Sequence, residues 1–368
     1  MNKLISFFFC FFPLLALLAC NKEKEPFTES SCTEVLDRWA INTVDYFNNS
    51  KSDLFFTSNE VGYVVGIAGT ILKTSNGGLD WELTNYKKTT SNSDRFAHLQ
   101  TIYFIDESIG YIGGKSIFDF STNTHSGAVL LHTSDGGENW AERYFENVLN
   151  IHDLIFFDQE NGLGLFTVRN EDDNSELRMV KTNNKGETWN EIPLPLKRIR
   201  SYQFTATSSF LIIWGSDEYN KSFILKSKDN GLNWQIASNP QPNNATLSSM
   251  YFIDEEFGFA ICGRAIYQTK DSGNSWKEIS SPMNSHALIH FSSRTEGFVF
   301  SPVFEVFEGN FEPLLVLKFY EVFQTIDGGM EWTKTEIPKE CDFTGLSYSP
   351  SKNTLFSIGK TINRFDIK

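Results

Sequence analysis

The chain has 368 residues, of which 40% are hydrophobic and 15% aromatic, and its formal net charge is −14 at pH 7. This acidity argues against nucleic-acid binding, because a basic surface is needed to displace the counterions of the phosphates. The five cysteines do not cluster, so we predict no metal site, no cofactor and no disulfide framework. A single bridge stays open as an alternative in an oxidising compartment.

The first segment, residues 1–19, is predicted to be an export signal. Lys3 is followed by an apolar run from Leu4 to Ala19, which is short for a membrane-spanning helix. The run ends in Leu17-Leu18-Ala19-Cys20, which resembles the lipobox of bacterial lipoproteins. The resemblance implies cleavage before Cys20 and acylation of that residue. An ordinary secreted protein with a chance cysteine is the alternative.

Residues 20–33 are polar and charged and show no hydrophobic period, which predicts a flexible tether. We therefore expect a protein held by its N-terminal lipid in the bacterial cell envelope, at the outer membrane, on the periplasmic or the surface side. The remaining residues, 34–368, are predicted to form one domain, because they share one internal repeat.

An eight-residue motif, Ser/Thr-x-Asp/Asn-x-Gly-x-x-Trp, recurs six times in this domain. The copies are TSNGGLDW (74–81), TSDGGENW (133–140), TNNKGETW (182–189), SKDNGLNW (227–234), TKDSGNSW (269–276) and TIDGGMEW (325–332). This is the Asp-box, or BNR, motif, and the chain resembles the Asp-box β-propeller proteins.

A second phrase alternates with the box: an aromatic residue, a polar turn, a glycine and an apolar strand. It begins at Phe56, Phe104, Phe156, Phe204, Phe252 and Phe291, with Phe210 in place of the glycine in the fourth copy. A degenerate seventh copy begins at Tyr348 and ends without a tryptophan, whereas Trp39 precedes the first complete copy. We therefore predict an all-β fold, a single seven-bladed β-propeller of four-stranded blades, whose N-terminal strand completes the last blade and closes the ring.

The Asp boxes are predicted to be structural. Their Asp or Asn side chains can accept backbone N–H bonds in a tight turn, the glycine supplies a positive φ, and the tryptophan can pack between sheets. Asn in two copies suits a turn and would damage a general acid. These structural positions are Asn76, Asp135, Asn184, Asp229, Asp271 and Asp327, with Trp39, Trp81, Trp140, Trp189, Trp234, Trp276 and Trp332. Repeated cation or sugar sites are the alternative.

Function is predicted on the opposite face, where the loops vary. An insertion at 302–320 is expected to form an extra hairpin there. The starts of the inner strands reach the same face and carry cationic and hydrogen-bonding side chains that suit an anionic or hydrogen-bonding partner. The candidate partner-binding residues are His98, His152, Arg198, Arg200, Tyr202 and His286. Ordinary solvated rim residues are the alternative.

The two alternating phrases together are similar to those of the photosystem II stability/assembly factor family. That resemblance implies a propeller that binds protein partners, although the lipobox, the acidity and the insertion at 302–320 make a photosystem role unexpected. Sialidases resemble the chain more distantly in their Asp boxes, but their Arg-Ile-Pro motif is absent; Lys-Arg-Ile-Arg at 197–200 lacks the proline.

We therefore expect a monomeric, lipid-anchored envelope propeller that binds a protein or a glycan without catalysis, in an assembly or scaffolding role. A glycoside hydrolase is the alternative, and it would need two facing carboxylates that the sequence does not single out.

Overall fold

The computed structural model describes residues 35–36, 39–44, 51–84, 97–116, 127–169, 175–196, 199–240, 246–279, 281–282, 287–307, 314–338, 345–349, 354–358 and 362–367. The predicted signal, the tether, Cys20, Arg198 and His286 lie outside these residues, and so do the side chains of Trp39, Arg200 and Tyr202. Among the described residues, no helix is long and apolar enough to cross a membrane.

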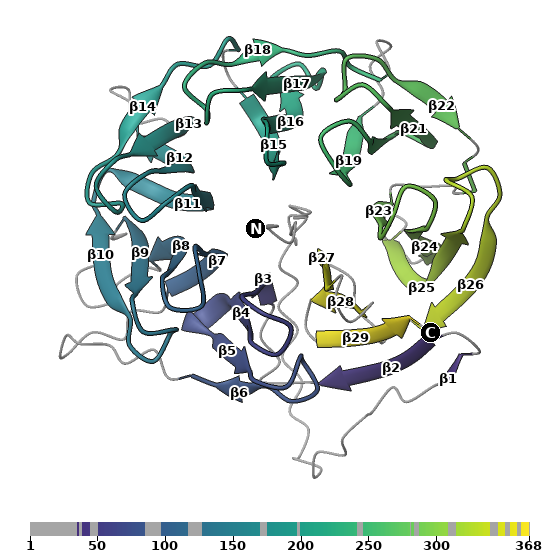
Figure 1. The fold of residues 1–368 in the computed structure, drawn as a ribbon, viewed down its shortest axis with the longest axis horizontal. Helices are drawn as coiled ribbons and strands as arrows, with labels where there is room; N and C mark the ends of the chain where they lie inside the picture. The colour runs from purple at the N-terminus through teal and green to yellow at the C-terminus, as the bar shows by residue number, and fades with distance from the viewer. Residues whose placement is uncertain are drawn as a thin grey trace.

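Short antiparallel sheets stand around a common axis, and in the six four-stranded blades the first strand is innermost (Figure 1). Blade 1 contains β3 (Lys51–Phe56), β4 (Gly62–Gly66), β5 (Ile71–Thr74) and β6 (Glu82–Leu83). Blade 2 contains β7 (Ala97–Phe104), β8 (Gly110–Ser116), β9 (Ala128–Thr133) and β10 (Ala141–Phe145). Blade 3 contains β11 (Val148–Phe156), β12 (Gly162–Arg169), β13 (Ser175–Thr182) and β14 (Asn190–Ile192).

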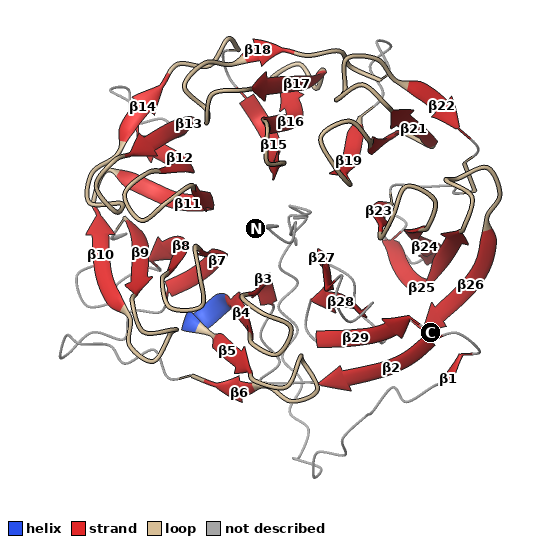
Figure 2. Ribbon diagram, viewed as in Figure 1, coloured by secondary structure: helices blue, strands red, loops and turns tan. Residues whose placement is uncertain are grey.

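Blade 4 contains β15 (Ile199–Ala206), β16 (Leu211–Asp217), β17 (Ser222–Ser227) and β18 (Gln235–Ile236). Blade 5 contains β19 (Leu247–Phe252), β20 (Gly258–Cys262), β21 (Ala265–Thr269) and β22 (Lys277–Ile279). Blade 6 contains β23 (Leu288–Phe291), β24 (Gly297–Phe307), β25 (Leu314–Thr325) and β26 (Thr333–Pro338). The 3-10 turn η1 (Ile67–Gly69) is the element drawn in blue in Figure 2.

The prediction of seven four-stranded blades is wrong, because the structure has six blades of four strands. The remaining strands, β1 (Val35–Leu36), β2 (Trp39–Val44), β27 (Gly345–Ser349), β28 (Thr354–Ile358) and β29 (Ile362–Ile367), form a five-stranded closing sheet. The extra strand, β1, forms a hairpin with β2. Two residues are too few to carry a hydrophobic period, so the sequence could not reveal it.

The N-terminal strand β2 pairs along its whole length with the C-terminal β29, from Trp39 opposite Ile367 to Val44 opposite Ile362. This pairing is the ring closure expected from the sequence. The described residues of the insertion at 302–320 belong to β24 and β25. The insertion lengthens these two strands, which pair from Gly297 opposite Thr325 to Phe307 opposite Leu314.

Stacked aromatic rings join neighbouring blades. Tyr63 of blade 1 stacks on Phe104 of blade 2 with ring centroids 4.5 Å apart, and Tyr111 stacks on Phe156 at 3.8 Å. Phe259 stacks on Phe291 at 3.5 Å, and Phe356 of the closing sheet contacts Phe56 at 4.8 Å. Such pairs add stability beyond their buried area.

The glycine of the second phrase makes room for these rings. A Cβ added to Gly110 would lie 2.5 Å from the ring of Phe104, its cross-strand partner. In blade 4 the small and the large residue exchange places: the small Ala206 stands at the position of the ring, and the larger Leu211 stands opposite it at the position of the glycine. The alignment predicted for blade 4 is therefore shifted. Ala206, and not Phe204, stands where the other blades have the aromatic ring, and Phe210 lies inside the turn instead of at the glycine position.

The box turns define one face of the ring. In the second copy, the Thr133 hydroxyl donates to Asp135 Oδ1 at 2.8 Å, and the same oxygen accepts the Asn139 backbone N–H at 2.9 Å. Both Gly136 and Gly137 have positive φ, 67° and 77°. The Gly136 N–H donates to the Ser108 carbonyl in the turn between β7 and β8, so both turns share one face. The loops after the second and fourth strands therefore lie on the other face.

In four of the box turns, a backbone carbonyl also accepts a hydrogen bond from a side chain of the preceding sheet. In the second copy, Tyr63 Oη and Lys73 Nζ donate to the Gly136 carbonyl at 2.6 and 3.1 Å. Equivalent donors elsewhere are Lys226 to the Ser272 carbonyl, Gln268 to the Gly328 carbonyl and Arg364 to the Gly77 carbonyl. The box turns therefore also hold neighbouring blades together.

Candidate partner-binding site at the inner strands

Bulges interrupt the inner strands of five blades near the loop face. In β3, β7, β11 and β19 the unpaired residue lies four residues before the last paired residue of the strand. In β15 it lies six residues before the last paired residue, which is two residues earlier in the strand. The bulged residues are Ser52, Gln100, His152, Ser248 and Arg200. Bulges change the direction of side chains and are frequent beside functional sites, so these positions indicate a candidate site.

A polar network joins two of these bulges across blades 2 and 3. The Asn150 amide donates to Gln100 Oε1 at 2.7 Å and lies 3.0 Å from His152 Nδ1. His152 Nε2 lies 2.7 Å from the Thr167 hydroxyl. Asn150 is only 8% exposed, yet its Oδ1 has no hydrogen-bond partner among the described residues. A buried acceptor without a donor is costly, so the network is incompletely satisfied at this oxygen.

The two histidines of this region are neutral at pH 7. Burial lowers the pKa of His152 to about 4, with a smaller contribution from the positive charge of Lys115. Burial also lowers the pKa of His98, again followed by Lys115. Lys115 is exposed and lies opposite His98 in the β7–β8 ladder. The region therefore combines one exposed cation with neutral imidazole and amide groups.

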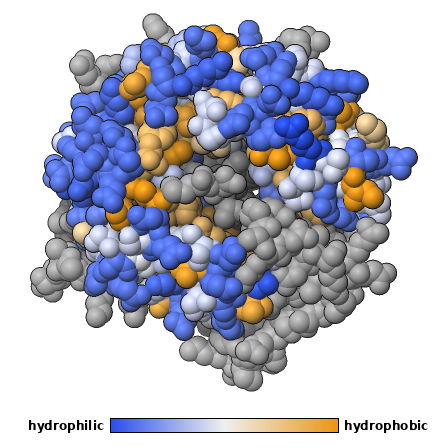
Figure 3. Space-filling view, in the orientation of Figure 1, coloured by the Kyte–Doolittle hydropathy of each residue, from blue (hydrophilic) through white to orange (hydrophobic). Residues whose placement is uncertain are grey.

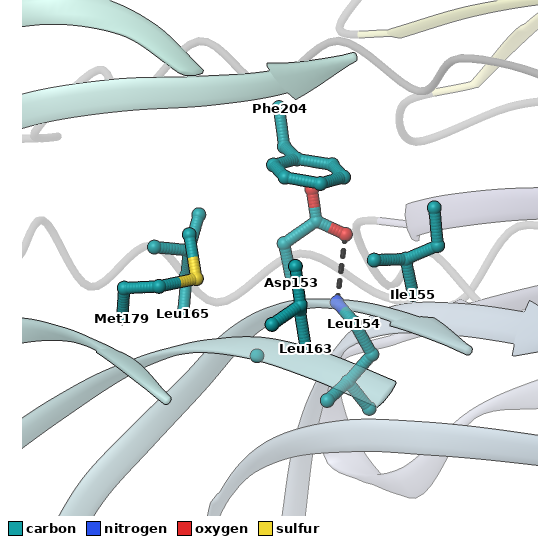
Figure 4. Close-up of a pocket in the computed structure, with 8 residues that line it drawn as sticks. Asp153, Leu154, Ile155, Leu163, Leu165, Met179 and Phe204 are labelled. Carbon is teal, nitrogen blue, oxygen red and sulfur yellow. Dashed lines mark hydrogen bonds between the residues drawn. The ribbon is translucent and has the colours of Figure 1, made fainter. Parts of the chain in front are cut away.

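A small apolar pocket lies on the other side of β11, between blades 3 and 4 (Figure 4). The gap is narrow and its apolar lining is buried, with Met179 1% and Phe204 8% exposed. Figure 4 shows the Asp153 carboxylate beneath the ring of Phe204, with Leu163, Leu165 and Met179 along the wall. Asp153 follows the bulged His152 directly, so the pocket adjoins the polar network.

The pocket exists because this blade interface lacks its aromatic pair. Cross-strand register places Leu163 at the position of Tyr63 and Tyr111, and Ala206 at the position of Phe104 and Phe156. Where four other interfaces have two rings in contact, this one has two smaller side chains. The space that remains lies beside Phe204.

Of the predicted binding residues, the structure places His98 and His152 in this region. Arg200 is the bulged residue of β15, and Tyr202 lies two residues beyond it in the same strand. Sequence reasoning missed Gln100, Asn150 and Thr167, because a bulge leaves no mark in the hydrophobic pattern. One feature of the sequence could have indicated the region. A polar residue interrupts each of three otherwise apolar strands, three residues before the phenylalanine that packs on the neighbouring sheet, at Asp53, Thr101 and Asp153.

The carboxylates of the inner strands fasten blades together. Asp53 Oδ2 accepts the Ile102 N–H of blade 2 at 2.9 Å, and its Oδ1 accepts the Leu54 N–H. Asp153 Oδ1 accepts the Thr101 hydroxyl at 3.2 Å and the Leu154 N–H at 2.8 Å. Both groups therefore act as hydrogen-bond acceptors within the fold.

Other chemistry finds little support in the part of the chain that the structure describes. It contains no group of three His, Cys, Asp or Glu residues able to hold a metal ion. Cys262 is a buried free thiol whose pKa burial raises to about 12, so it is a poor nucleophile. The box carboxylates stay ionised: a hydrogen bond from the Asn139 side chain is the main cause that lowers the pKa of Asp135 to about 2. Figure 3 shows hydrophilic residues over much of the outer ring and apolar ones nearer its centre.

Fold and site together define an all-β propeller with a polar network at the inner strands of blades 2 and 3. The sequence profile of the family "Photosynthesis system II assembly factor YCF48" matches residues 32–153. Among solved structures, "YCF48 bound to D1 peptide" is 16% identical, with a TM-score of 0.62 over 92% of this chain and 100% of that one. YCF48 from Cyanidioschyzon merolae is 13% identical, with a TM-score of 0.61 over 89% of this chain and 98% of that one.

An ancestral GH74 enzyme shares the fold at a TM-score of 0.54 and 13% identity, covering 84% of this chain but 43% of the enzyme. No curated protein matches the chain. The chain is therefore a propeller similar to the photosystem II assembly factor YCF48, and at these identities the similarity to solved structures establishes the fold alone.

Proposed function

We propose that the chain is a lipid-anchored envelope propeller that binds a protein partner at the inner ends of blades 2 and 3. The observation that carries the proposal is the network of Gln100, Asn150 and His152, with its buried, unpaired Asn150 Oδ1. Lys115, exposed opposite His98 beside this network, is the cation that a partner can contact. A structural neighbour, YCF48 bound to D1 peptide, supports a peptide as the kind of ligand that this fold can take.

Partner capture from the native envelope tests this binding site. We would use the full chain as bait and compare the parent with Lys115→Glu and Gln100→Ala. The matched control is Lys228→Glu, which makes the same charge change at an exposed position in a box turn on the opposite face. Loss of a captured protein in the first two variants but not in the control is the expected result. Equal capture by all four proteins would remove the site from the proposal.

The lipid anchor belongs to the same proposal and rests on the resemblance of Leu17–Cys20 to a lipobox. We expect Cys20→Ala to shift the protein from the membrane fraction to the soluble fraction, or to leave it as an uncleaved precursor. Metabolic labelling with a fatty-acid analogue checks acylation directly. Labelling that persists in the Cys20→Ala variant would contradict the anchor.

A further inference from the structure

We propose that the inner edge of β24 in blade 6 binds an extended, basic segment of the partner protein as an added β-strand. This inference rests on the proposed function and adds the mode of binding and the chemistry of the bound segment. The edge consists of residues 303–307, where β24 continues past the inner strand β23 on the loop face (blade 6 in Figure 1).

The second strand of blade 6 extends far beyond the first, unlike those of the other blades. In the other five blades the inner strand pairs with the second strand to its end or to within one residue of it. In blade 6 the pairing with β23 ends at Leu288 opposite Phe300, whereas β24 runs on to Phe307. Residues 303–307 thus have β25 on one side and no strand among the described residues on the other. Such an edge is a template for a further strand.

Backbone direction decides which groups this edge presents. In the turn before β24 the Ser292 N–H donates to the Glu296 carbonyl, so every second residue from Glu296 turns its backbone groups toward β23. The alternation continues through Pro302, Phe304 and Val306. Pro302 fits such an edge, because proline has no N–H and is tolerated where no neighbouring strand needs one. Phe304 and Val306 each offer an N–H and a C=O group to an added strand.

Exposure and charge select the occupant. Phe304 is 43% exposed, so an apolar contact is available at the edge. Glu305 lies between the two edge-facing residues, and a lysine or arginine directly opposite it would complete a cross-strand pair of opposite charge. The net charge of −14 favours the same basic segment.

A second copy of this chain is a poor occupant of the edge. The antiparallel register that would join Phe304 of one copy to Val306 of the other places Glu305 opposite Glu305. Like charges directly opposite each other destabilise a sheet, and both copies would carry the same net negative charge. The bound segment is therefore assigned to another protein.

Two variants change the edge without changing the ladder to β25. Val306→Pro removes an edge-facing N–H at a position with the same backbone direction as the natural Pro302. Glu305→Lys reverses the charge and tests the edge even where the proline variant fails to fold. Its matched control is Glu331→Lys, the same charge change at an exposed position of the blade 6 box turn on the opposite face. Thermal unfolding shows which variants are folded.

Hydrogen–deuterium exchange of the full chain, read by mass spectrometry, measures strand addition. The probes are acetyl-Thr-Val-Lys-Val-Thr-amide, its version with Glu for Lys, and a Lys version N-methylated at both valines. We expect the Lys peptide to slow exchange at residues 303–307 saturably, by roughly threefold or more, because the edge amides gain acceptors. The Glu and N-methylated peptides should have no effect, and β20, which is paired along both edges, should be unchanged. In Glu305→Lys the Glu peptide should become the effective one, whereas Glu331→Lys should behave as the parent.

Three results would overturn the inference: no slowing with the Lys peptide, equal slowing with the N-methylated peptide, or an unchanged peptide preference in Glu305→Lys. A dimer of the parent in sedimentation that Val306→Pro abolishes would identify a second copy as the occupant and overturn it as well.

Partner capture separates the added strand from the proposed function. Full capture by a folded Val306→Pro protein, with loss in Lys115→Glu, overturns the added strand and leaves the proposed function standing. Absence of capture by the parent itself counts against the proposed function, and the exchange result then decides the added strand by itself.

Discussion

The interface between blades 1 and 2 and the interface between blades 3 and 4 are built from the same repeat but packed differently. At the first, Tyr63 stacks on Phe104 and its hydroxyl donates to the Gly136 carbonyl. At the second, Leu163 and Ala206 replace the rings, and a pocket remains beside Phe204. The contrast shows how one repeat can pack its blades with stacked rings at one interface and with smaller aliphatic side chains at another.

The largest expected effect comes from making the first interface resemble the second. Phe104→Ala removes a ring that stacks on Tyr63 and meets Trp140 edge-on at 6.1 Å. We expect a loss of about 3–5 kcal/mol in the free energy of unfolding, because a large buried side chain is replaced by a cavity. Urea denaturation measures this loss. A change below about 1 kcal/mol would mean that the ring pair does not hold the blades together.

A change of pH should alter the stability of the region around blade 3, where His152 lies. Burial lowers the folded-state pKa of His152 to about 4, below the ordinary histidine value of 6.5, so the unfolded chain binds the proton more readily. The stability from its neutral form is present above about pH 6.5 and is lost as the pH falls toward 4. We expect a loss on the order of 1–2 kcal/mol from this group.

The difference between the parent and His152→Asn in urea denaturation at pH 7.5 and 4.5 isolates this contribution. His290 of blade 6, whose pKa burial lowers to about 3, is unchanged in both proteins and cancels in the difference. A pH dependence that is the same with and without His152 would contradict the prediction.

The turn at the blade 1–2 interface should be sensitive to a single methyl group. Gly137 has a φ of 77°, and a Cβ there would lie 3.0 Å from the Tyr63 ring. We expect Gly137→Ala to cost about 1–3 kcal/mol, because the left-handed backbone and the close ring both disfavour a side chain. Thermal unfolding would show the loss as a lower Tm, and an unchanged Tm would show that the turn can relax.

The smallest effect expected is the loss of one hydroxyl. Tyr63→Phe removes the 2.6 Å hydrogen bond to the Gly136 carbonyl and should cost about 1 kcal/mol. Tyr111→Phe is the matched control, since the Tyr111 hydroxyl is buried with no hydrogen-bond partner among the described residues. Its removal should be neutral or slightly stabilising. Equal losses in the two variants would show that the hydrogen bond adds nothing to the stacking.

The sequence predicted much of the fold, because strands, turns and tryptophans repeat with it. It identified the turns around Asp135 and its equivalents and the pairing of the N-terminal strand with the C-terminal one. It failed on the number of four-stranded blades, because the two-residue strand Val35–Leu36 carries no pattern. It also misplaced the phase of blade 4, where Ala206 and Leu211 exchange the sizes of the usual ring and glycine.

The candidate site was less accessible to prediction. His98 and His152 could be chosen because inner strands begin near them, but the bulge that presents His152 depends on the register of two strands. The pocket depends on what is missing from one interface, namely the ring at Leu163 and the ring at Ala206. The missing rings can be recognised only when the strand registers of the blades are compared, and the sequence alone does not give these registers.

The pairing of β2 with β29 has a mechanical consequence. Trp39 lies opposite Ile367, so the outer ends of these two strands lie at the same end of their ladder. A force that pulls the two strands apart from these ends would load the hydrogen bonds one after another rather than all together. The ring would then unzip at its closing sheet under a low force, while the blades between, which carry no load until that ladder opens, would unfold only later.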